Sequence, residues 1–160
     1  MPDGIYASPF LVRRACVAAL IALAVILLGF PVSAHAATSW SAPASIDHDG
    51  QQSLYAVACP AANQCTAVDG DGQQVTFDPT TPGTPTPATV DAGNVLGAVA
   101  CPTTSQCTAV DGNGDEVTFA PGTPGTPTPR SIDSANNLKS VACPSSSQCV
   151  AVDDQGQEIT

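Results

Sequence analysis

Cysteine and aspartate are the residues of this 160-residue chain that could do chemistry, because both recur at a fixed spacing. Six cysteines form three pairs with five residues between the two members, and equivalent cysteines lie 42 positions apart. The pairs are Cys59 with Cys65, Cys101 with Cys107, and Cys143 with Cys149. The same sequence pattern surrounds each pair, so the chemistry and the architecture of the chain have to be explained together.

The spacing of the cysteines favours disulfides over metal or redox chemistry. Many pairings are possible, but the repetition favours a bond within each pair, because a hairpin brings its ends to the Cα separation of about 4.4–6.8 Å that a disulfide needs. Zinc sites prefer roughly two to four residues between their cysteines, and redox sites use a Cys-x-x-Cys motif that the chain lacks. The sequence therefore predicts the bonds Cys59–Cys65, Cys101–Cys107 and Cys143–Cys149, and no cofactor.

Aspartates near the cysteine pairs give a second candidate chemistry, which is calcium binding. Asp111, Asn113 and Asp115 place oxygen ligands at alternate positions, as calcium loops do, and Asp69 and Asp71 match this pattern in part. The glycine and the final glutamate of an EF-hand loop are missing. Asp-Gly and Asn-Gly are also typical of hairpin turns that hold no ion. Calcium is therefore one hypothesis, and a turn without a metal is the other.

Few residues could support catalysis. His48 is the one histidine beyond residue 36, and its place between two aspartates fits a solvated turn better than a general base. No glycine-rich phosphate loop follows a strand and opens a helix. The net charge of −10 opposes contact with a nucleic acid backbone. The sequence therefore predicts a protein that is not an enzyme and does not bind nucleic acid.

The N-terminal residues indicate the compartment. Two arginines precede the apolar run from Ala15 to Phe30, which would span about 24 Å as a helix and is shorter than a bilayer core of roughly 30 Å. The small-residue pattern Ala-His-Ala follows and ends at Ala36. We predict a signal peptide over residues 1–36, cleaved after Ala36, and a secreted product. The alternatives are a chain tethered to the membrane by this uncleaved segment and a cell-wall protein.

The elements that must position the cysteines and aspartates are three copies of one unit, at about residues 53–94, 95–136 and 137–160. In each copy, the apolar pattern predicts a first strand with little exposed face (54–59 in the first copy). It also predicts a second strand that starts at the second cysteine. A third strand alternates apolar and polar residues, with Val75 and Phe77 on one face. Repeats of this length indicate a stacked or radial all-β architecture.

Thr-Pro-rich linkers join the copies at 78–91 and 120–133. We interpret them as exposed loops, with an O-glycosylated spacer as the alternative, and expect a short fourth strand at the end of each. The N-terminal segment 37–52 contains a similar stretch at 41–47, which we expect to be a closing strand that completes the last copy. Propellers normally have at least four blades. The expected fold is therefore a partial propeller or half of a dimeric ring, with a β-trefoil as the alternative.

The unit V-A-C-P-x4-C-x-A-V-D-x-x-G-x-x-[VI]-T resembles repeats of exported proteins from high-GC Gram-positive bacteria. Those repeats are generally described as β-propeller blades, distantly similar to the BNR-like repeats of photosystem II stability factors. Trp40 also fits the segment between such blades. The resemblance implies four-stranded blades but no common activity. The S-x-D-x-G-x-x-W box of many BNR repeats is absent, so sialidase chemistry is not implied.

Together these observations predict a secreted, disulfide-stabilised β-repeat module that binds or displays. Its expected partner is a protein or a cell-wall glycan, and a homodimer is one expected assembly. One alternative is a glycan-active enzyme on a propeller scaffold, which would need two carboxylates about 5–9.5 Å apart. Another is a fragment of a longer repeat protein. Contact with a membrane is expected only through an uncleaved N-terminal segment.

Overall fold

The computed structural model describes residues 39–48 and 53–160. The chain divides into two units, Met1–Ser41 and Ala42–Thr160, and the fold described below is that of the second unit. The predicted signal peptide and its cleavage point at Ala36 lie outside the described residues. Within the described ranges, no helix is long and apolar enough to cross a membrane.

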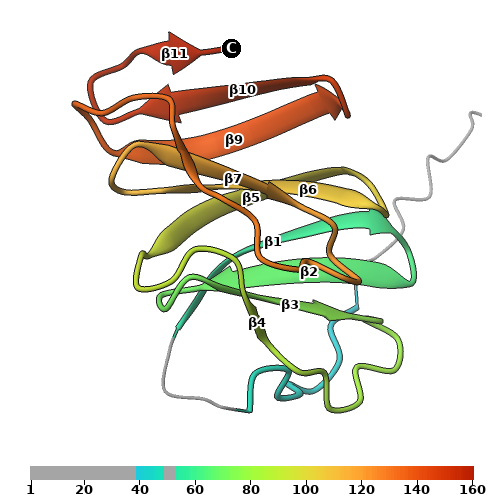
Figure 1. Cartoon of the computed structure of the whole chain (residues 1–160). Helices are drawn as coiled ribbons and strands as arrows, with labels where there is room; N and C mark the ends of the chain where they lie inside the picture. The colour runs from blue at the N-terminus through green and yellow to red at the C-terminus, as the bar shows by residue number, and fades with distance from the viewer. Residues whose placement is uncertain (1–38, 49–52) are drawn as a thin grey trace, which may run out of the picture. The chain divides into compact units, whose positions relative to one another are not determined.

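Each copy of the repeat forms one antiparallel sheet (Figure 1). The first sheet has the order β1 (Leu54–Ala61), β2 (Gln64–Asp69), β3 (Gln73–Phe77) and β4 (Ala88–Thr89). The second has the order β5 (Leu96–Thr103), β6 (Gln106–Asp111), β7 (Asp115–Phe119) and β8 (Arg130–Ser131). The third contains β9 (Leu138–Ser145), β10 (Gln148–Asp153) and β11 (Glu158–Ile159), with β10 in the middle. The short fourth strands predicted after the Thr-Pro linkers are confirmed as β4 and β8.

Neighbouring sheets pack face to face, with β5 against β1 and β9 against β5 (Figure 1). Between the first two sheets, Val68 lies in one apolar cluster with Leu96 and Phe119. Between the second and third sheets, Val110 lies in a second cluster with Leu138 and others. The middle strands can bury both faces in this way because each sheet has a neighbour. The fold is an all-β partial propeller, as predicted, and the alternative β-trefoil does not form.

The first strand of each copy runs further than the sequence predicted. Ala58 pairs with Thr66 and Ala61 pairs with Gln64, so two residues of β1 lie opposite the single residue Cys65. The extra residue is a β-bulge, and it falls at Cys59 and Pro60. Proline has no N–H to donate, so it is tolerated where the ladder is already interrupted. The expectation that Pro60 would end the strand was therefore wrong.

The prediction that β1 has little exposed face was also wrong. Leu54 is 40% exposed, whereas its equivalents Leu96 and Leu138 are 0% and 2% exposed. Val57 is 58% exposed, against 8% and 9% for Val99 and Val141. The same two residue types, leucine and valine, stand at these positions in all three copies. However, no sheet precedes the first one among the described residues. An apolar strand stays exposed when its sheet is at the end of the stack.

The closing strand expected at residues 41–47 does not form. This segment lies at the end of the stack that carries the first sheet, whereas β11 lies at the opposite end (Figure 1). Ile46 lines a shallow hollow of the first sheet together with Tyr55 and Phe77. A fourth strand needs the free edge of a third strand as its partner. The third sheet consequently keeps three strands within the described residues.

Candidate functional site

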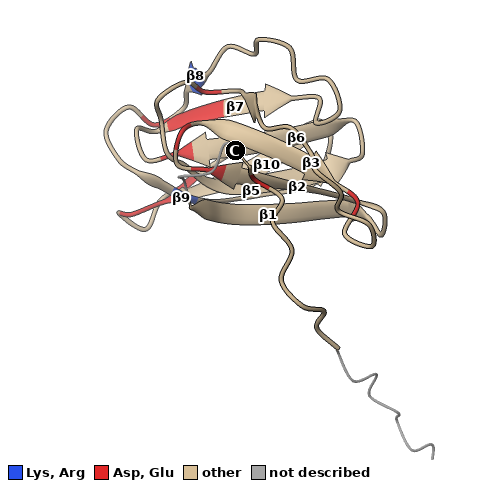
Figure 2. Ribbon diagram, turned by 90° about the horizontal axis from the view of Figure 1, so that it is seen from below, with Lys and Arg blue, Asp and Glu red and all other residues tan. Residues whose placement is uncertain are grey.

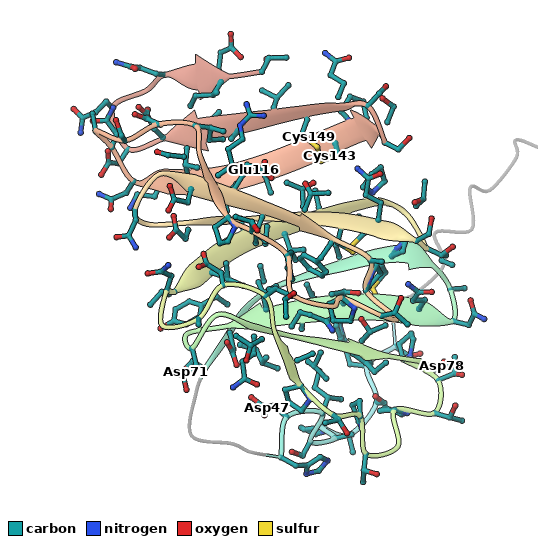
Figure 3. All side chains as sticks on the ribbon, in the orientation of Figure 1. Asp47, Asp71, Asp78, Glu116, Cys143 and Cys149 are labelled. Carbon is teal, nitrogen blue, oxygen red and sulfur yellow. A yellow bond between two sulfur atoms is a disulfide. The ribbon has the colours of Figure 1, made fainter. Side chains whose placement is uncertain are left out.

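The six cysteines form the three disulfides that the repeat predicted. Cys59 bonds to Cys65, Cys101 to Cys107 and Cys143 to Cys149, with Cα–Cα distances of 4.1, 4.1 and 4.0 Å. Each bond joins the two strands of a hairpin at its bulge, as Figure 3 shows for the third pair. Cys65 and Cys107 are buried. At least one half of each of the first two bonds therefore lies in the interior of the fold.

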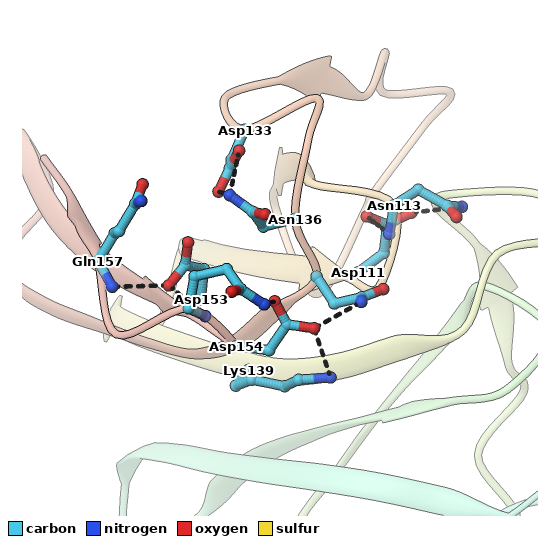
Figure 4. A network of polar contacts seen from close by, with 10 residues as sticks. Asp111, Asn113, Asp133, Asn136, Lys139, Asp153, Asp154 and Gln157 are labelled. Carbon is cyan, nitrogen blue, oxygen red and sulfur yellow. Dashed lines mark hydrogen bonds and ion pairs between the residues drawn. The ribbon is translucent and has the colours of Figure 1, made fainter.

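Three equivalent aspartates hold the turn after the second strand of each sheet. Asp69 Oδ1 accepts hydrogen bonds from the backbone N–H groups of Asp71 and Gln73, at 2.9 and 2.7 Å. Asp111 and Asp153 each accept two amides in the same way, at 2.7–2.9 Å (Figure 4). All three side chains are buried. Such charge-assisted bonds close the turn between the second and third strands of each hairpin.

The residues weighed for calcium take part in these turns. Asn113 Nδ2 donates to Asp111 Oδ2 at 3.1 Å and to Asn94 Oδ1 at 2.9 Å, so its amide group offers a donor where an ion would need an acceptor. The backbone N–H groups of Asp71 and Asp115 donate to Asp69 and Asp111. Among the residues that the structure describes, no group of three or more His, Cys, Asp or Glu side chains is arranged to hold a metal ion.

The aspartates gather mostly at one end of the strands, close to β7 and β9 (Figure 2). Asp91 is buried, and burial raises its pKa, although a hydrogen bond from Asn94 works in the opposite direction. The negative charges of Asp111 and Asp115 raise the pKa of Asp91 further. In contrast, the hydrogen bond from Asn137 holds the pKa of the exposed Asp154 below its usual range, and Gln155 and Lys139 add to this effect (Figure 4).

A cavity of about 460 Å³ opens between the second and third sheets. The side chains of Thr108, Val110 and Thr118 line it from the second sheet, and Val141, Ala151 and Ile159 line it from the third. Its charged lining residues are Glu116 on β7 and Arg130 on β8, and Figure 3 labels Glu116. The cavity thus has an apolar floor with hydroxyl, carboxylate and guanidinium groups around it.

The equivalent space between the first and second sheets is filled by the chain itself. Phe119 and Pro121 are buried there. The carbonyl oxygen of Pro121 accepts hydrogen bonds from Gln74 Nε2 and Thr76 Oγ1, both at 3.2 Å.

The second sheet therefore presents an unfilled copy of this arrangement. Glu116 and Thr118 are the equivalents of Gln74 and Thr76, and both line the open cavity. Thr118 is exposed, and its hydroxyl lies 2.8 Å from that of Thr108. The sequence analysis missed this site. A signal in the sequence was the Phe-x-Pro motif at 119–121, which supplies the two residues buried between the first and second sheets.

The remaining candidate from the sequence, His48, is exposed in a bend next to Asp47. Asp47 itself is half-buried. Neither residue lines the cavity between the second and third sheets. The structure thus separates the histidine that was considered as a base from the one large cavity described above.

No family model matches the sequence, and no curated protein matches it either. Solved structures do resemble the fold. One is YCF48 bound to D1 peptide, with a TM-score of 0.56 and 10% identity over 68% of this chain and 38% of that chain. Another is the C-terminal WD40 domain of Sif2, with a TM-score of 0.53 and 8% identity over 68% of this chain and 33% of that chain. The chain spans between a third and two fifths of these neighbours, and what it shares with them is the β-propeller fold.

Proposed function

We propose that this protein is an exported binding module that holds an extended segment of a protein partner between its second and third sheets. The observation that carries the proposal is the open cavity at the place where Phe119 and Pro121 fill the preceding pair of sheets. A propeller-like neighbour, YCF48, was solved with a peptide bound. That neighbour supports a peptide as the class of ligand.

The lining of the cavity defines what a partner segment should contain. An aromatic side chain would occupy the apolar floor as Phe119 does in the preceding pair. The hydroxyl of Thr118 donates to Glu116 Oε2 at 3.1 Å in this structure and would turn to donate to a backbone carbonyl of the partner, as Thr76 does to Pro121. Glu116 replaces Gln74, and an ionised carboxylate accepts hydrogen bonds but cannot donate them. A donor group such as an amide N–H or a lysine in the partner would therefore suit Glu116.

Binding without catalysis is the function that this cavity supports best. Glu116 carries the one side-chain carboxylate among the residues that line it. Hydrolysis of a glycosidic bond would need a second carboxylate about 5–9.5 Å away. The lining therefore favours a non-enzymatic role over the glycan-active alternative.

Export is the second part of the proposal. Three disulfides are typical of proteins that fold in an oxidising compartment. The predicted signal peptide over residues 1–36 agrees with this compartment. We also infer that the repeats are related to the exported blade-like repeats that the sequence resembles. Detection of the protein outside the cytoplasm, with a new N-terminus at Ala37, would test the location.

A labelled peptide with the sequence of residues 117–124, which includes Phe119 and Pro121, is a suitable probe of the cavity. We expect saturable binding in a fluorescence anisotropy titration, and at least tenfold weaker binding when the peptide phenylalanine is replaced by serine. The variant Thr118→Arg should also weaken binding at least tenfold, because a long cation would enter the cavity. Thr89→Arg, on the exposed outer strand of the first sheet, is the matched control. Equal binding by both variants would contradict the proposal.

A further inference from the structure

The first two sheets receive their fourth strand through the same backbone contact. The carbonyl oxygen of Gly72 accepts hydrogen bonds from the N–H groups of Val90 and Asp91, both at 2.9 Å. The carbonyl oxygen of Gly114 accepts the equivalent pair from Ile132 and Asp133, both at 3.0 Å. The incoming strand lies so close that a Cβ atom on Gly72 or Gly114 would be 1.5 or 1.6 Å from a carbonyl oxygen. Only glycine fits at these two positions.

The third sheet has the same contact site, and no part of the chain that the structure describes occupies it. Gly156 has a φ of 81°, close to the 76° of Gly72 and the 87° of Gly114. Gly72 and Gly114 are buried, but Gly156 is exposed and a Cβ atom on it would meet nothing within 4 Å. Within the described residues, no strand pairs with the outer edge of β11. The backbone is thus already shaped for a fourth strand.

A segment that matches this site lies at the other end of the stack. Ser45-Ile46-Asp47 corresponds to Thr89-Val90-Asp91 and to Ser131-Ile132-Asp133. Ile46 packs on the open face of the first sheet beside Leu54 and Val57, just as Ile132 packs beside Leu138 and Val141 in the second cluster. Residues 44–47 therefore occupy the place of a fourth strand whose own sheet is missing. One chain cannot join them to Gly156, because the first and third sheets are separated by the second (Figure 1).

The two outer faces of the stack continue an interface that the chain builds twice. Gln64 Nε2 donates to the carbonyl oxygen of Thr104 at 2.7 Å, and Gln106 Nε2 donates to that of Ser146 at 3.0 Å. The next glutamine in this series is Gln148, which is exposed on the third sheet. The next carbonyl is that of Ala62, in the β1–β2 turn of the first sheet. Leu96 and Val99 of the second sheet are buried against the first sheet, whereas their equivalents Leu54 and Val57 on the first sheet are exposed.

We propose that two copies of this chain join head to tail into one ring of six sheets. In this ring, residues 44–47 of each copy form the fourth strand of the other copy's third sheet. The N–H groups of Ile46 and Asp47 donate to the carbonyl oxygen of Gly156 across the interface, and Gln148 donates to Ala62. Six blades lie within the range of closed propellers, and a head-to-tail contact is complete only when its ring closes. The ring uses the outer edge of β11 and the open face of the first sheet, whereas the proposed peptide site lies between the second and third sheets, so the two proposals can be tested separately.

Light scattering on the protein as exported by its host tests the assembly. We expect twice the mass of the processed chain over a hundredfold range of concentration. Gly156→Ala should shift the mass to that of one chain, because the new Cβ atom would lie in the path of the incoming strand. Gly93→Ala is the matched control, since Gly93 has a φ of 79° and open space around it. A single-chain mass for the unchanged protein, or an open series of larger species, would overturn the two-copy ring.

Cross-linking keeps the test decisive even if Gly156→Ala does not fold. Gln73 pairs with Thr89 and Asp115 pairs with Ser131, so Gln157 should pair with Ser45 of the other copy. A Ser45→Cys chain mixed with a differently tagged Gln157→Cys chain should give a covalent heterodimer on a non-reducing gel. Ser147→Cys, at the far end of the third sheet, should give none with the same partner. Equal cross-linking of Gln157→Cys and Ser147→Cys would refute the strand exchange.

Discussion

At the scale of single residues, the aspartate at the end of each second strand holds the following turn by hydrogen bonds. Asp69, Asp111 and Asp153 each accept two backbone amides of the following turn with one carboxylate oxygen. Burial of such a carboxylate without its donors would destabilise the folded state. Loss of the carboxylate would leave the amides without an acceptor, which would also be destabilising. The repeated Val-Asp sequence is therefore explained by hairpin closure.

We predict that Asp111→Ala lowers the free energy of unfolding by about 2–4 kcal/mol, because two backbone amides of the turn lose their buried acceptor. Asp71→Ala should change it by less than about 0.5 kcal/mol, since the side chain of Asp71 is exposed. Chemical denaturation of both variants measures the difference. A similar loss in the two variants would argue against the role given to Asp111.

Addition of millimolar calcium to the unchanged protein should leave its Tm as it is if the loops act as turns alone.

At the scale of elements, the unit of the fold is a hairpin with a bulge, and a disulfide crosses it at the bulge. Cys59 and Pro60 lie opposite Cys65, and the copies at Cys101 and Cys143 repeat this arrangement. The bulge lets a proline enter the strand without breaking a needed hydrogen bond. The disulfide then limits the freedom of a chain that has few aromatic residues for its core.

The double variant Cys101→Ala/Cys107→Ala should lower the free energy of unfolding by about 2 kcal/mol by the chain-entropy model, plus the loss of packing around the buried Cys107. Its counterpart Cys59→Ala/Cys65→Ala removes a disulfide that closes a loop of the same length, so the entropic part of the loss should be the same. Any difference between the two double variants measures packing. Denaturation of both under identical conditions makes the comparison. No loss in either variant would contradict a stabilising role for the disulfides.

At the scale of the whole molecule, three stacked sheets leave two unlike ends. The first sheet exposes apolar side chains that its copies bury, and the third sheet has an unpaired edge and an open cavity. A stack whose inner contacts repeat regularly can be extended at either end by another sheet of the same kind. The two ends of the stack therefore carry the proposal of a ring, and the cavity between the second and third sheets carries the proposal of peptide binding.

Val57 and Val99 hold the same place in successive copies, and comparing them reports on what covers the first sheet. Val99→Ala should lower the free energy of unfolding by about 2 kcal/mol at any protein concentration. Val57→Ala should cost less than about 0.5 kcal/mol in dilute solution, and more at concentrations where copies associate. Thermal unfolding at two concentrations tests this. A cost for Val57→Ala that is independent of concentration would show that no second copy covers Val57.

The sequence by itself determined the repeat, its strands and its covalent bonds, because these depend on contacts between residues close in the chain. The pairing of Cys59 with Cys65 and the alternation of Val75 and Phe77 both follow from local spacing. The prediction that the first strand stops at Pro60 was wrong, because the presence of a proline does not reveal a bulge.

Only the tertiary structure decided which copies of the similar repeat are buried and which are open. Leu54 and Leu96 are equivalent in sequence, but one lies at the end of the stack and the other inside it. Residues 41–47 have the sequence of a fourth strand, yet they form no strand, because β4 already lies beside β3 in the first sheet. Burial and edge pairing depend on neighbours that are far away in the chain, so the cavity, the free edge at Gly156 and the exposed first sheet become visible only in three dimensions.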